Sequence, residues 1–255
     1  PESVTKEGPH EPLVKYFTEE EPPKELFEQW ADFYEKKPHV AIRELITVIL
    51  FIGSSVEIEI DDKEFKKNLT SEVEEQFTEK LKEVESDTPI DDFFKGANEK
   101  AYDFWTELSN SLIVSKGLFL DEFDDFLKNW VFTFCESNDR TLRRSATVTV
   151  CSIIKFLADS VNTSNTELEK LKKGSKSKSS KTSVVNHQIE SFETELDNSR
   201  SLAMELFTSV MKPRLRDKDD KIREICIKTM GEISILAPED FGDNNFIKLL
   251  GNALT

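Results

Sequence analysis

Residues 120–161, LDEFDDFLKNWVFTFCESNDRTLRRSATVTVCSIIKFLADSV, decide the fold. Apolar side chains recur there at spacings of three and four residues, first over 120–134 and again over 142–161. Such spacing places them on one face of an α-helix. A short polar joint at Asn138 and Asp139 separates the two periods. The stretch therefore predicts two amphipathic helices that pack as an antiparallel hairpin.

The same helical spacing continues on both sides of this hairpin. It covers residues 26–34, 40–52, 65–81, 93–112, 189–210 and 222–236. Segment 40–52 is apolar on more than one side, so we expect it to be buried on more than one side. Residues 56–60 alternate apolar and acidic residues, and they predict an extended connector because no second strand is available. Roughly nine helices with short joints predict an all-α fold, a solenoid of degenerate HEAT-like helical hairpins.

Two segments interrupt the helical pattern. Residues 1–24 hold five prolines, which predicts an extended or disordered tail, docked weakly at most through Leu13, Tyr16 and Phe17. Residues 163–186 are rich in Lys, Ser, Thr and Asn, which predicts a loop. Helical regions are expected at 25–162 and 187–255. The apolar pattern near residue 255 has not closed, so we expect a piece of a longer protein.

Composition and charge disfavour several classes of protein. The net charge of −16 argues against a general nucleic-acid binder, whose surface is basic. No apolar run approaches the roughly 18–20 residues that cross a bilayer, so no membrane partner is expected. Cys135, Cys151 and Cys226 are an odd number of widely spaced thiols, which favours a reducing compartment.

No group of residues predicts catalysis. His10, His39 and His187 lie in no nucleophile signature, and the glycines never cluster into a phosphate-binding loop. Acidic residues at 121–125 alternate with apolar ones at helical spacing, which is typical of a solvated helix face. We expect no catalytic residue, no metal site and no cofactor.

Basic segments are the sharpest signal because they oppose the global charge. We consider three of them as candidate contacts to DNA phosphates. The first consists of Lys170, Lys172, Lys173, Lys176, Lys178 and Lys181, the second of Lys212, Arg214, Arg216, Lys218 and Lys221, and the third of Arg143 and Arg144. The alternatives are a merely solvated insertion, salt bridges within a repeat (above all for Arg223), and an acidic neighbour at a helix start. Lysine-rich tracts bind the DNA backbone without sequence preference.

Two motifs resemble a known family. Residues 143–147, RRSAT, are similar to the R-H-T-S-T helix of the stromalin (stromal antigen) subunits of cohesin. Residues 214–217, 222–227 and 230–231 resemble the R-Y-R-D…I-R-A-I-C-I-E-E-I-G signature that opens the stromalin conserved domain. The resemblance extends from about Leu26 to the end of the chain, and the lysine tract suggests a fungal-type member.

This resemblance implies a curved HEAT-repeat α-solenoid in a nuclear, chromosome-bound cohesin subunit that acts in sister chromatid cohesion. It implies attachment to the kleisin subunit mainly through regions C-terminal to this stretch, contacts to other cohesin regulators, and DNA contact here. Asn252 stands where animal members have a Trp that receives aromatic peptide motifs, so that pocket is in doubt. The alternative function is an acidic HEAT-repeat scaffold for proteins, of the transport-receptor or phosphatase type, without DNA binding.

Overall fold

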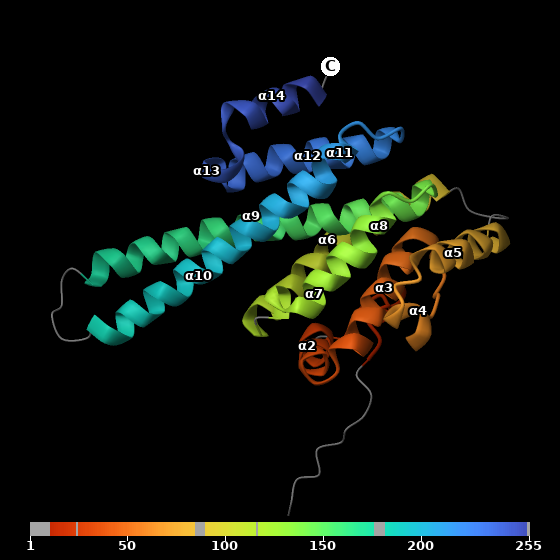
Figure 1. The fold of residues 1–255 in the computed structure, drawn as a ribbon, viewed down its shortest axis with the longest axis horizontal. Helices are drawn as coiled ribbons and strands as arrows, with labels where there is room; N and C mark the ends of the chain where they lie inside the picture. Colours follow the sequence, from red (N-terminus) through yellow and green to blue (C-terminus); the bar gives the residue numbers. More distant parts are fainter. Residues whose placement is uncertain (1–10, 24, 85–89, 116, 176–181, 254–255) are drawn as a thin grey trace, which may run out of the picture. The chain divides into compact units, whose positions relative to one another are not determined.

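The computed structural model describes residues 11–23, 25–84, 90–115, 117–175 and 182–253, except for the side chains of 84, 90–99, 174–175 and 182–185. Within these ranges the regular structure is helical and contains no β-strand, which confirms the predicted all-α fold (Figure 1). The chain divides into two compact units, Pro1–Ala146 and Thr147–Thr255.

The first unit is built around one apolar helix, α3. Its elements are α1 (Lys15–Thr18), α2 (Leu26–Lys36), α3 (Pro38–Ser54), α4 (Asp62–Lys66), α5 (Thr70–Val84), α6 (Ile90–Ser115), η1 (Gly117–Phe119), α7 (Asp121–Phe126), η2 (Leu127–Val131), α8 (Phe132–Cys135) and the start of α9 (Arg140–Ser175). Helix α3 packs against α2, α5, α6 and α7. Eleven of its residues are buried, which confirms the prediction that it is enclosed on several sides.

The second unit contains the remainder of α9 and a set of shorter helices. They are α10 (Thr182–Leu206), η3 (Phe207–Met211), α11 (Lys212–Arg214), α12 (Asp220–Leu236), α13 (Pro238–Phe241) and α14 (Asn244–Ala253). The rings of Phe207, Phe241 and Phe246 form a cluster with centroids 5.2–5.9 Å apart. Lys155 joins α9 to α12 through Glu232 at 3.0 Å.

Two helix junctions, displaced by 80 residues, repeat the same hydrogen bonds. Each follows a π-helical turn, η2 or η3. In the α8–α9 turn, Asp139 accepts from the backbone N–H groups of 141 and 142, and Arg143 donates to the carbonyl oxygens of Ser137 (2.7 Å) and Asn138.

In the α11–α12 turn, Asp219 caps the backbone N–H groups of 221 and 222 in the same way. Arg223 donates to the carbonyl oxygens of Asp217 (2.8 Å) and Lys218. The two turns share the spacing of their hydrogen-bonding residues but differ in most residue types. The helical hairpins therefore form a degenerate repeat.

Removing the cap at Asp219 should weaken the second unit. We expect Asp219→Ala to lower its free energy of unfolding by about 1 kcal/mol, because two backbone N–H groups at the start of α12 lose their acceptor. Asp219→Asn should retain most of the stability, since Asn also caps helices. Urea titration followed by far-ultraviolet circular dichroism measures both. An alanine variant as stable as the asparagine variant would contradict this role.

The predicted loop at 163–186 is wrong over its described part. Helix α9 continues to Ser175 and α10 begins at Thr182. Glu167–Lys170 and Glu169–Lys173 pair at helical spacing, at 2.7 and 2.9 Å, and Leu168 is buried. These pairs and this burial support a helix in a segment whose polar composition predicted none.

The predicted tail also differs over its described residues. Leu13 and Val14 are buried, and the backbone N–H of Leu13 donates to the Glu44 carboxylate at 2.7 Å. Tyr16 and Phe17 pack against Phe104. Prolines near the start of the chain therefore coexist with a docked segment at 13–18.

Candidate nucleic-acid interface

Exposed cations gather at the junction of α11 and α12. Figure 1 shows this junction at the opposite end of α10 from the α9–α10 connection. Lys212, Arg216 and Lys218 are exposed and make no ion pair with any described residue. Lys221 is exposed and reaches Glu224 on its own helix at 3.0 Å. These four residues are called the basic turn below.

Arg214 stabilises the turn itself and is only partly exposed. Its guanidinium donates to the carboxylate of Asp217 at 2.8 Å, and the Asp217 side chain is almost fully buried. A buried carboxylate needs such a partner, because an uncompensated charge inside a protein is costly. The candidate phosphate contact at Arg214 therefore competes with an ion pair that the fold uses.

The cations of the basic turn are not required by the turn itself. At the corresponding positions of the α8–α9 turn, 80 residues earlier, the chain carries other side chains. These are Phe132, Glu136, Asn138 and Thr141. The same backbone geometry forms there, so local folding does not require positive charge at these positions.

Arg143 and Arg144 lie inside their turn. They are 9% and 4% exposed, and Arg143 donates to two turn carbonyl oxygens. Little guanidinium surface is left for a phosphate, so the structure does not support the two predicted contacts. All residues from 141 to 150 are buried, so the start of α9 lies inside the protein.

The lysines on α9 are exposed but paired. Lys170 and Lys173 bind glutamates on the same helix, and Lys172 binds Glu193 of α10 at 2.8 Å. The hydrogen bond from Lys173 holds the pKa of Glu169 below its ordinary value. Exposed pairs of this kind contribute little and exchange partners readily. Lys176, Lys178 and Lys181 lie outside the described residues.

These lysines and the basic turn do not form one patch. The Lys172–Glu193 contact places the α9 lysines beside residue 193 of α10, whereas the basic turn begins 19 residues later at Lys212. At 1.5 Å per helical residue, the separation is roughly 30 Å. One helical turn of B-form DNA has about the same length.

The described residues contain no group of three His, Cys, Asp or Glu side chains that could hold a metal ion. Among the same residues, no helix combines the length and apolar content needed to cross a bilayer. All three cysteines are buried, and none forms a disulfide.

Comparison with known proteins finds one family model and one relative of similar sequence. Residues 91–195 match the sequence model of the STAG domain. Over 136 residues the chain is 24% identical to "Cohesin subunit psc3" of Schizosaccharomyces pombe, covering 51% of this chain and 14% of that protein. The chain is therefore similar to cohesin subunits over part of its length.

A solved structure of a cohesin subunit shares the fold of this chain. "Cohesin subunit Scc3" from Z. rouxii superposes with a TM-score of 0.72 at 17% identity, over 97% of this chain and 31% of that one. The helical solenoid prediction is confirmed by this match. The chain spans less than a third of the length of either relative.

The STAG match covers one of the two motifs that suggested the stromalin family. It includes RRSAT at 143–147 and ends before residue 214, where the second motif begins. Sequence reasoning grouped Arg143, Arg144 and Arg216 as equivalent candidates. The 80-residue correspondence between Arg143 and Arg223 could have separated turn-forming arginines from surface ones, because salt bridges within a repeat were the favoured alternative for Arg223.

Proposed function

We propose that this chain is part of a nuclear cohesin subunit that contacts duplex DNA without sequence preference through the basic turn. The STAG-domain match and the similarity to the cohesin subunits psc3 and Scc3 support the cohesin role. The subunit itself is non-enzymatic and serves as a scaffold. Attachment to the kleisin falls mainly to regions beyond this chain, as do contacts with other regulators.

One observation carries the DNA contact. The basic turn holds four exposed cations that its counterpart turn lacks, on a chain whose net charge is −16. Local positive charge on an acidic protein attracts polyanions to one place, while the remaining surface repels them. Lys and Arg side chains that neutralise phosphates release counterions, and this release drives binding.

The α9 lysines provide a second contact along the same duplex. Their separation of roughly 30 Å from the basic turn spans about nine base pairs, at 3.4 Å per step. Phosphate contacts of this kind fix position without reading bases, so affinity should not depend on sequence. We include Lys176, Lys178 and Lys181 in this second contact.

The test is a titration of labelled duplex DNA with this chain, followed by fluorescence anisotropy at two salt concentrations. The four contacts of the basic turn alone predict that log K falls with log salt at a slope of about −3.6, and the α9 lysines make the slope steeper. Two duplexes of unrelated sequence should give the same affinity. Failure to bind at low salt would instead support an acidic scaffold that binds only proteins.

A further inference from the structure

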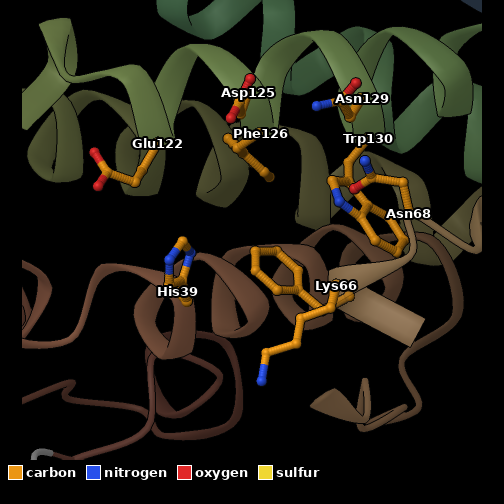
Figure 2. Close-up of a pocket in the computed structure, with 9 residues that line it drawn as sticks. His39, Lys66, Asn68, Glu122, Asp125, Phe126, Asn129 and Trp130 are labelled. Atoms are coloured by element: carbon orange, nitrogen blue, oxygen red, sulfur yellow. The ribbon is translucent and has the colours of Figure 1, made fainter. Parts of the chain in front are cut away.

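A small cavity opens in the first unit between two layers of helices. Figure 2 shows α3 and α4 on one side and α7 with η2 on the other. The cavity measures about 240 Å³. Sites for drug-sized ligands occupy roughly 300–1,000 Å³, so this one has the size of a single side chain.

The charge of the cavity is negative. Glu122 and Asp125, one helical turn apart on α7, line it and make no ion pair with any described residue. Asp124, between them, is bound by Lys128 at 2.8 Å. Lys66 is the cation among the lining residues, and it is held by Asp62 on its own helix.

Aromatic rings form the remaining walls. Phe65 and Trp130 stack with centroids 6.1 Å apart and planes at 10°, and Phe126 is buried beside them. Trp130 is 1% exposed, and its indole N–H makes no hydrogen bond to any described residue. Figure 2 shows this ring at the cavity wall beside Asn68. Because this N–H group has no acceptor among the described residues, it can donate to a group that enters the cavity.

We propose that this cavity receives an arginine side chain presented by a protein partner. The guanidinium is planar, matches carboxylates with paired N–H donors and lies flat against aromatic rings. Glu122 and Asp125 bind its N–H groups, and Phe65 and Phe126 contact its aliphatic stem. A carbonyl oxygen of the partner accepts the hydrogen bond from Trp130.

Other occupants fit less well. An anion would meet two uncompensated carboxylates. His39 also lines the cavity, but the described residues contain no group of three His, Cys, Asp or Glu side chains that could hold a metal ion. Lysine supplies charge, but its compact and strongly hydrated ammonium neither stacks on rings nor pairs in parallel with carboxylates. The proposal is independent of DNA binding, because the basic turn lies in the other unit.

The indole N–H signals of the ¹⁵N-labelled chain test this site. The chain has three tryptophans, and Trp130→Phe identifies the signal of Trp130. N-acetyl-arginine amide should shift that signal in a saturable manner, while the neutral isostere N-acetyl-citrulline amide should not. Either no shift with the arginine compound or an equal shift with citrulline overturns the proposal. An equal response to N-acetyl-lysine amide overturns the choice of arginine.

Variants on α7 supply the matched comparison. The double change Glu122→Gln and Asp125→Asn should weaken the arginine compound by roughly tenfold or more, since two charge-assisted hydrogen bonds lose their charge. Asp124→Asn removes a charge from the same helix but outside the cavity, and should leave the affinity nearly unchanged. Equal weakening by both variants would show a general electrostatic effect and contradict a built site.

Discussion

Reversing the charge of Lys212, Arg216, Lys218 and Lys221 to Glu should nearly abolish binding to duplex DNA. A surface cation contributes about 1 kcal/mol against a phosphate at contact distance in water. Loss of four such contacts amounts to roughly a thousandfold in affinity, and the introduced repulsion adds to it. The salt slope should become shallower by about 3.6, because the counterions released by these four contacts are no longer released. Anisotropy titration of the 255-residue chain measures both quantities.

The control for this experiment changes the same number of charges elsewhere. Lys36, Lys63, Lys67 and Lys82 are exposed in the first unit and make no ion pair with any described residue. Their reversal to Glu alters the net charge by the same amount as reversal of the basic turn. We expect it to reduce affinity far less. Comparable loss in both variants would mean that net charge, and not the basic turn, controls binding.

The helices were predictable because their apolar spacing is long and regular. Segment 40–52 shows this most clearly, since its apolar excess correctly predicted burial on several sides of α3. The extension of α9 to Ser175 was not predictable from composition. It depends partly on Lys172 meeting Glu193, a contact between segments 21 residues apart. Polar helices stabilised by such pairs resemble loops when only their composition is considered.

The candidate site was predictable only as a set of charges. Sequence alone singled out the cations of the basic turn and also Arg143 and Arg144. The cations of the basic turn are exposed and the two arginines are buried, a difference that depends on tertiary packing. Arg143 is held by turn carbonyl oxygens, whereas Arg216 is exposed on an equivalent turn. The acidic cavity escaped prediction because His39, Phe65 and Trp130 come from segments that only the fold brings together.

The aromatic cluster around Phe104 supports the second large prediction. Its ring lies 5.4 Å from Tyr16, 5.1 Å from Phe17, 5.4 Å from Phe27 and 5.2 Å from Trp105, between centroids. Phe104 itself is fully buried. Truncation of such a side chain leaves a cavity and removes ring contacts, so Phe104→Ala should lower the free energy of unfolding of the first unit by about 3–5 kcal/mol.

Tryptophan fluorescence during urea unfolding isolates this effect, because Trp30, Trp105 and Trp130 all lie in the first unit. Phe132→Ala is the comparison. That ring is half-buried in the same unit, and its removal should cost about 1–2 kcal/mol.

Residues 13–18 dock partly through Phe104, so the Phe104 variant should also expose them to limited proteolysis under native conditions. The opposite result would be that Phe104→Ala lowers the free energy of unfolding no more than Phe132→Ala does and leaves residues 13–18 protected from the protease. Lys100 and Glu44 would then hold the segment without the aromatic cluster. Both residues bind its backbone directly, Lys100 at the carbonyl oxygens of Phe17 and Glu19 and Glu44 at the N–H of Leu13.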